Sequence, residues 1–344
     1  MTDYKSIFKS ISDVATLGTF HMALLKKTAS KKDDHKREVL AVEIDNEVKD
    51  RFADILKNNC NFIINNDTID FVDFFSGSDE DDSILVLSSE DMEQVGTLYP
   101  IITQVQCEDD IEYVKELNEK VIKKLQTYVI CVQKRNTDQN YKQTCICFRK
   151  YGKGYRIAKN GLLAFKNGKF EKIDSDIFKC DNFIDAIYYE LLLEKKDKDD
   201  NEISIQNMFV KNTKNFEDIF AFHELYKREG KKLYDFFESH ENIEIQEGIF
   251  EEIDDKISYL KPMTKLGKKD LIDIFDFDST KQIYERASEK YLLNFEIADD
   301  KVIIKNKEAL KDFLAFCGKE IVRDPLDDNV FFKSKGNKEL PRRT

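Results

Sequence analysis

The sequence predicts an α+β protein: an N-terminal α/β portion, a central, mostly antiparallel sheet over residues 126–210, and a helical C-terminal portion. Three observations predict it. The dipeptides Asn160-Gly161 and Asn167-Gly168 each suit a two-residue type I′ turn, which predicts a meander of three short strands. Apolar residues on both sides of this stretch recur at helical spacing. Short apolar runs near residue 130 and residue 205 predict further strands.

The first 125 residues are predicted to form an α/β domain, and residues 126–344 a second domain. The helix that we expect over residues 111–125 has Asp109 and Asp110 at its favourable N-terminal end, and we place the domain boundary after it. The other elements expected before it are a helix from Tyr4, strands over 17–25 and 39–44, a helix from Val48, a buried strand over 84–87 and a brief helix capped by Ser88 or Ser89.

The two turns fix the register of the meander, because a two-residue loop leaves one way to pair its strands. Lys159 is expected opposite Leu162, Lys166 opposite Lys169, and Phe165 opposite Phe170. Two like charges directly opposite each other are unfavourable. Either a bound anion relieves the lysine pair, or both side chains turn into water at the hairpin tip. The expected basic face holds Tyr155, Lys159, Lys166 and Lys169.

After the meander we expect strands over residues 183–193 and 203–210. The remaining expected elements are a long helix capped by Asn215 and running to Phe237, a helix from Ile249 stopped by Pro262, a helix over 283–292, a hairpin at Asp299-Asp300, a helix capped by Asn306 and ended by Gly318, and a last strand over 330–332.

Composition indicates a globular protein of about two domains. Of the 344 residues, 41% are hydrophobic, but no run approaches the roughly 18 apolar residues of a membrane span, and the N-terminus lacks a signal-peptide layout. We therefore expect a cytoplasmic protein. Seven cysteines without C-x-x-C spacing predict free buried thiols, with neither a disulfide framework nor a zinc site.

Charge is distributed unevenly along the chain. The net charge is −12, yet residues 126–180 carry 12 basic and 4 acidic side chains, a net of +8. The neighbouring residues 1–125 and 181–260 each carry a net of −11. One basic block between two acidic ones suggests a local polyanion site; pairing of charges between domains is the alternative.

The sequence Asp276-Phe-Asp-Ser-Thr280 matches the Asp-x-Asp-x-Thr signature of haloacid-dehalogenase-like phosphatases. Too little chain follows for the rest of that fold, and a helix cap at Asp278 or Ser279 explains the residues more simply. The chain has no phosphate loop and no helical His-Glu-x-x-His. An enzyme is therefore not predicted: no catalytic residue, metal ligand or cofactor is assigned.

The layout of residues 178–239, a strand, a charged turn, the segment Ile203 to Asn212 and then a helix opened by Asn215-Phe-Glu-Asp-Ile-Phe, resembles the Kiwa KwaB-like family of bacterial antiphage defence proteins. The strand Gly161 to Lys166 and the C-terminal block from Lys301 to Lys335 resemble that family as well. The resemblance implies a cytosolic DNA-binding effector that works with a small membrane protein, KwaA. It is also compatible with a homodimer, and any membrane association would run through the partner.

Together, the basic block and the resemblance predict sequence-independent DNA binding through the phosphate backbone. The residues assigned to it are Lys150, Lys153, Arg156, Lys159, Lys166 and Lys169. The alternatives are a non-catalytic interaction scaffold and, third, a metal-dependent nuclease or phosphatase.

Overall fold

The computed structural model describes residues 3–27, 37–44, 46–75, 83–106, 113, 125–136, 139–150, 163–166, 169–172, 184–193, 202–268, 275–288, 293–318, 321–323, 331–333 and 338–339. The chain divides into two compact units, Met1–Phe222 and His223–Thr344. The α+β fold class is confirmed.

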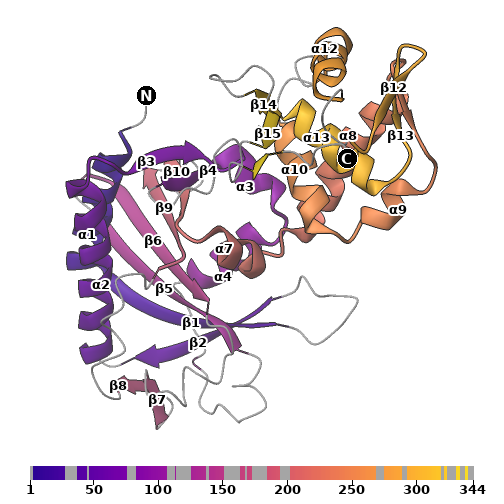
Figure 1. Ribbon diagram of the computed structural model, residues 1–344. Helices are drawn as coiled ribbons and strands as arrows, with labels where there is room; N and C mark the ends of the chain where they lie inside the picture. The colour runs from indigo at the N-terminus through magenta and orange to yellow at the C-terminus, as the bar shows by residue number, and fades with distance from the viewer. Residues whose placement is uncertain are drawn as a thin grey trace. The chain divides into compact units, whose positions relative to one another are not determined.

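The first unit is built on one large sheet, which has 10 strands among the described residues (Figure 1). From edge to edge the strands are β3 (Asp70–Asp73), β4 (Ser83–Ser88), β10 (Glu202–Val210), β9 (Ala186–Leu193), β6 (Tyr141–Lys150), β5 (Leu125–Asn136), β1 (Thr19–Lys27), β2 (Arg37–Ile44), β8 (Lys169–Lys172) and β7 (Leu163–Lys166). Neighbouring strands are antiparallel, except that β3 pairs with β4 and β2 with β8 in parallel.

The β7–β8 hairpin has the register that its Asn-Gly turn predicted. Lys166 lies opposite Lys169, and Phe165 opposite Phe170. The hairpin lies at one edge of the sheet, beside β2, whereas the middle of the sheet is formed by β9, β6, β5 and β1. The hairpin of the basic meander thus lies at the edge of the sheet and not in its middle. Both turns of the meander, at Asn160-Gly161 and Asn167-Gly168, lie outside the described residues, so the type I′ assignment stays a prediction.

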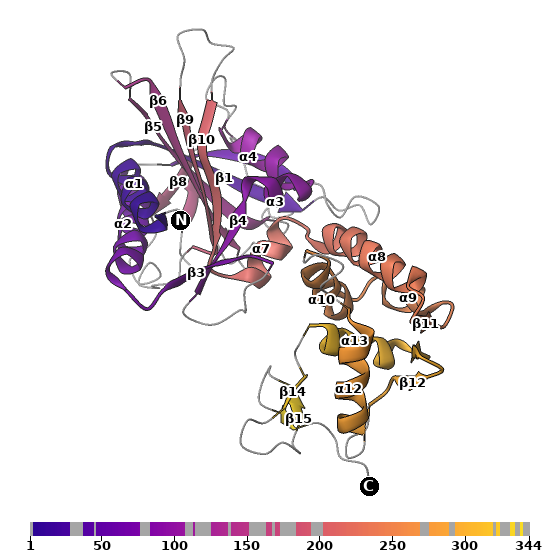
Figure 2. The same ribbon diagram turned by 90° about the horizontal axis from the view of Figure 1, so that it is seen from above.

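Helices cover both faces of this sheet. The helices α1 (Tyr4–Leu17) and α2 (Asn46–Asn65) lie side by side along one face, and α3 (Ser89–Gln94) and α4 (Leu98–Gln106) lie on the other (Figure 2). Beneath α1, the rings of Phe8, Phe71 and Phe209 pack together. A Cβ on Gly18 would lie 2.6 Å from Val132 Cγ1, so only glycine allows the chain to pass this closely from α1 into β1.

The long helix expected from Asn215 is two helices, α7 (Thr213–Ile219) and α8 (His223–Ser239). Asn212, not Asn215, caps α7, since its side chain accepts a hydrogen bond from the Asn215 N–H at 3.0 Å. Ala221 has a φ of +50°, and the Phe222 N–H donates to the Glu217 carbonyl, the pattern of a Schellman stop. Unbroken apolar periodicity concealed this stop.

The second unit packs helices around aromatic side chains. Its helices are α8, α9 (Ile249–Ile253), α10 (Ile257–Gly267), α12 (Phe277–Ser288) and α13 (Lys307–Cys317). Its strands are β11 (Ile243–Ile245), β12 (Glu296–Ala298) and β13 (Lys301–Ile304), in the order β11-β13-β12, and β14 (Ile321–Arg323), β15 (Phe331–Lys333) and β16 (Lys338–Glu339). The ring of Phe313 contacts the rings of Phe237, Phe275 and Phe295.

Most local predictions in this unit are confirmed. Asp299 and Asp300, with φ of +51° and +55°, turn β12 into β13, and Asn306 caps α13. Three predictions are wrong. The single helix expected from Ile249 is two helices, α9 and α10, and Pro262 lies inside α10 and does not stop it. Asp276, not Asp278 or Ser279, caps α12, because its carboxylate accepts hydrogen bonds from both of those residues.

The five cysteines in the described part of the chain are buried and free, as predicted. In that part, no helix has the length and apolarity needed to cross a bilayer. The division into domains at residue 125 stays a prediction. The helix expected over residues 111–125 lies outside the described residues except for Tyr113 and for Leu125, which begins β5.

Candidate nucleic-acid interface

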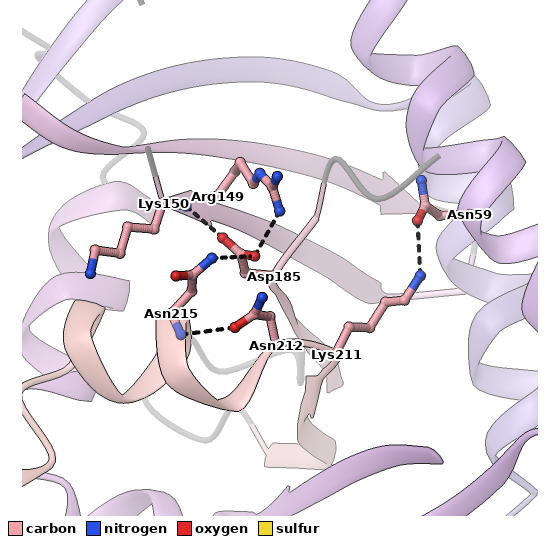
Figure 3. Close-up of polar contacts among 7 residues, drawn as sticks. All are labelled: Asn59, Arg149, Lys150, Asp185, Lys211, Asn212 and Asn215. Atoms are coloured by element: carbon pink, nitrogen blue, oxygen red, sulfur yellow. Dashed lines mark hydrogen bonds and ion pairs between the residues drawn. The ribbon is translucent and has the colours of Figure 1, made fainter. Parts of the chain in front are cut away.

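A fully buried carboxylate, that of Asp185, organises the end of the sheet where β6 stops and β9 begins (Figure 3). One oxygen, Oδ1, accepts hydrogen bonds from Arg149 Nη1 at 2.8 Å and from Asn215 Nδ2 at 2.9 Å. The other, Oδ2, accepts the backbone N–H of Lys150 at 2.6 Å. Three donors, one of which is the cationic guanidinium of Arg149, therefore compensate the burial of the carboxylate.

The backbone of Asp185 joins the same elements. Its N–H donates to the Phe148 carbonyl at 2.8 Å, and its carbonyl accepts the N–H groups of Lys211 at 2.8 Å and of Asn212 at 3.0 Å. Asn212 in turn caps α7. One residue thus fixes the end of β6, the start of β9, the exit from β10 and the start of α7.

Arg149 and Lys150 are consecutive in β6, so their side chains leave opposite faces of the sheet. Arg149 goes to Asp185, and 25% of its side-chain surface is exposed. Lys150 makes an ion pair with Asp218 of α7. The Asp218 carbonyl also accepts a hydrogen bond from Arg37 Nη2 at 2.9 Å. At this end of the sheet, Arg149 and Lys150 are held by carboxylates beside and on α7, and Arg37 by a backbone carbonyl of α7.

Lys211 extends from the end of β10 toward α2, where its Nζ lies 3.2 Å from Asn59 Oδ1 (Figure 3). Burial lowers the pKa of Lys211, and the nearby Cys60 thiol opposes that shift. Burial raises the pKa of the Cys60 thiol. Cys60 is therefore a protonated core thiol at neutral pH.

Of the six residues predicted to bind DNA, the structure describes three. Lys150 ends β6, and Lys166 and Lys169 face each other across the β7–β8 hairpin. Four strand steps separate β6 from β8 in the sheet, which corresponds to about 19 Å. The structure thus brings Lys166 and Lys169 together and holds Lys150 apart from them. Lys153, Arg156 and Lys159 lie outside the described residues.

The sequence-based assignment missed Arg149, Asp185, Asn212 and Lys211, and it gave Asn215 a different role. One signal was available for Asp185. It interrupts the apolar run from Phe183 to Tyr189, where an acid has to be buried and therefore needs partners. The identity of those partners was not available, because Arg149 and Asn215 are 36 and 30 residues away in the chain.

Neither alternative enzyme chemistry has an assembled site in the described ranges. No group of three or more His, Cys, Asp or Glu side chains is arranged there to hold a metal ion. Asp276 is occupied by its capping hydrogen bonds, which also lower its pKa, the side chain of Ser279 being the main cause.

The fold and the Asp185 cluster, which consists of Asp185 with Arg149, Lys150 and Asn215, together define the class of protein. It is an α+β protein in two compact units, with ordered cationic side chains at one end of its main sheet. The family model described as Kiwa protein KwaB-like matches residues 122–326, which is more than half of the chain. The chain belongs to this family and is therefore a Kiwa antiphage defence component. Comparison with curated proteins and with solved structures gave no match.

Proposed function

We propose that the protein binds DNA without sequence preference, through phosphate contacts made by the basic block of residues 126–180, as its part in antiphage defence. The observation that carries this proposal is the register of the β7–β8 hairpin, which sets Lys166 directly opposite Lys169. Paired lysines repel each other across a ladder, and a phosphate between them turns that repulsion into attraction.

The distribution of charge supports the same function. In a chain with a net charge of −12, a segment with a net of +8 draws a polyanion to one region while the remaining surface repels it. Lys150 and Lys169 are four strand spacings apart across the sheet, about 19 Å, and four residues apart along it, about 13 Å. The resulting separation of about 23 Å equals roughly seven steps of 3.4 Å along a duplex. Contacts at both places fit one continuous stretch of backbone.

A small membrane protein of the KwaA type is the proposed partner, and a homodimer the proposed assembly. Family membership supports the first, since it places the chain in the Kiwa system. An interaction scaffold that binds no DNA is the main alternative.

The test is a gel-shift titration of duplex DNA at several salt concentrations. We expect binding whose log affinity falls linearly with log salt, and little difference between two duplexes of unrelated sequence. The variant Lys159→Ala/Lys166→Ala/Lys169→Ala should reduce the slope by roughly 2 to 3, because each neutralised phosphate contributes about 0.9.

The matched control is Lys9→Ala/Lys49→Ala/Lys57→Ala, which removes the same charge from α1 and α2. It should leave the slope nearly unchanged. An unchanged slope in the first variant would show that the meander is not the site. No duplex binding even at low salt, with capture of the membrane partner, would establish the scaffold. Loss of DNA only when magnesium is present would establish a nuclease.

A further inference from the structure

Arg149 has a free edge on its guanidinium group. Asp185 engages Nη1 alone, at 2.8 Å, and Nε is buried without a hydrogen-bond partner. The edge formed by Nε and Nη2 therefore has no carboxylate on it in the part of the chain that the structure describes. This edge is a two-donor fork whose geometry matches two oxygens of a phosphate or carboxylate.

The guanidinium is also held in place. Asp185 cannot move, because its carboxylate accepts three hydrogen bonds and its backbone makes three more. An arginine oriented by a fixed buried acid loses little conformational freedom when a ligand binds, and so keeps more of the interaction free energy. A quarter of the Arg149 side-chain surface, 25%, remains exposed, but Nε itself is buried. A phosphate therefore reaches the Nε–Nη2 edge only when the chain that covers Nε moves aside.

The surroundings favour an anion. Lys214, exposed on α7, directly precedes Asn215, whose side chain shares the Asp185 Oδ1 atom with Arg149. Lys150 leaves the opposite face of β6. The charge of Arg149 is balanced by Asp185 and that of Lys150 by Asp218, so the exposed Lys214 supplies an additional positive charge. A carboxylate ligand would find the same donors, but within the proposed DNA-binding function the ligand is a phosphate.

We propose that Arg149 is a further phosphate-binding residue, which takes one phosphate group on its Nε–Nη2 edge while Asp185 positions it. This inference rests on the proposed function for the identity of the ligand, a DNA backbone phosphate. The phosphate group can also come from free phosphate or a phosphorylated small molecule, and the experiment separates these sources.

The direct measurement uses the full chain with ¹⁵N-labelled arginine. The Nε–H signal of Arg149, assigned by its absence from Arg149→Lys, is followed while inorganic phosphate, a short duplex or chloride at equal ionic strength is added. We expect the signal to shift with the duplex and, at higher concentration, with phosphate, but not with chloride. A shift with phosphate alone assigns a small-anion site and overturns the DNA contact. No shift with either means that an ordered water occupies Nε, and overturns the inference.

Variants test the contact in DNA binding. Arg149→Gln/Asp185→Asn removes both charges of the buried pair together, so that no uncompensated carboxylate unfolds the protein. Its salt slope should be smaller by about 0.9. Arg149→Lys keeps the charge and loses the fork, so most of the slope should remain while affinity falls by about tenfold. The control Lys9→Gln removes one exposed lysine of α1, outside the basic block. It should change neither quantity.

The outcomes separate the two proposals. If the chain binds no duplex at all, the proposed function fails, and the phosphate titration still decides whether Arg149 binds an anion. Suppose instead that the chain binds DNA and that the meander variant alters the salt slope. If the Arg149 variants then leave the slope unchanged, only the inference about Arg149 fails.

Discussion

At the scale of single residues, Asp185 is a buried carboxylate held by three hydrogen bonds at the end of the main sheet. Removing it leaves Arg149 without its counter-ion and leaves the donors of Lys150 and Asn215 unsatisfied. We expect Asp185→Ala to destabilise the protein by about 3 to 5 kcal/mol, the usual cost of breaking a buried ion pair from one side. Urea unfolding would measure the loss.

The comparison for this prediction is Asp218→Ala. Asp218 also pairs with a cation, Lys150, but its side chain is 54% exposed, so its removal should cost no more than about 1 kcal/mol. Similar losses in the two variants would mean that burial is not what makes the Asp185 cluster important.

Whether a residue-level feature can be predicted from the sequence depends on how far apart in the chain the interacting residues are. The pairing of Lys166 with Lys169 was predictable, because a two-residue turn sets it within four residues. The caps at Ser88 and Asn306 were predictable for the same reason. The partners of Asp185 were not, since they come from strands and a helix that meet only in the folded sheet.

At the scale of elements, the stop between α7 and α8 is the clearest departure from prediction. The φ of +50° at Ala221 occupies the position that glycine usually takes at a helix end. The left-handed conformation destabilises an alanine by about 1 to 2 kcal/mol, a cost that glycine avoids. Glycine, however, has the larger conformational entropy in the unfolded chain, which destabilises the folded state by about 0.5 to 1 kcal/mol. Ala221→Gly should therefore be neutral or stabilise by up to about 1 kcal/mol.

The same substitution in a helix interior has the opposite sign. Ala53→Gly, inside α2, should destabilise by about 1 kcal/mol, and thermal unfolding of the two variants side by side gives the comparison. A loss of similar size at Ala221 would mean that the helix continues through this position. Apolar spacing alone predicts a continuous helix, because it indicates which residues are buried. It does not indicate which residue adopts the left-handed conformation that ends the helix.

At the scale of the whole molecule, the sheet combines strands from before and after residue 125. The strands β10, β9, β6 and β5 are neighbours, and β4 borders this block on one side while β1 borders it on the other. A fragment of residues 126–344, the predicted second domain, would expose both borders as unpaired edges. We expect it to aggregate, whereas residues 223–344, a compact unit, should stay monomeric and unfold cooperatively.

Size-exclusion chromatography and circular dichroism of the two fragments beside the full chain test this. A monomeric, cooperatively folded 126–344 fragment would establish the predicted boundary. The sequence could not reveal that strands from both sides of residue 125 join one sheet. The order of strands in a sheet depends on which strand edges pair, and this pairing produces no periodic pattern of residues along the chain.

The interleaved strand order also determines when the protein can fold during its synthesis. The strand β4 pairs with β10 through Leu87 and Met208, which leave the ribosome about 120 residues apart. At roughly 5 to 20 residues per second, β4 waits about 6 to 24 s for this partner. The strand β1 similarly waits for β5. The apolar faces of α1 and α2 have no finished sheet to pack on during that interval, so the nascent chain needs protection by chaperones until β10 has emerged.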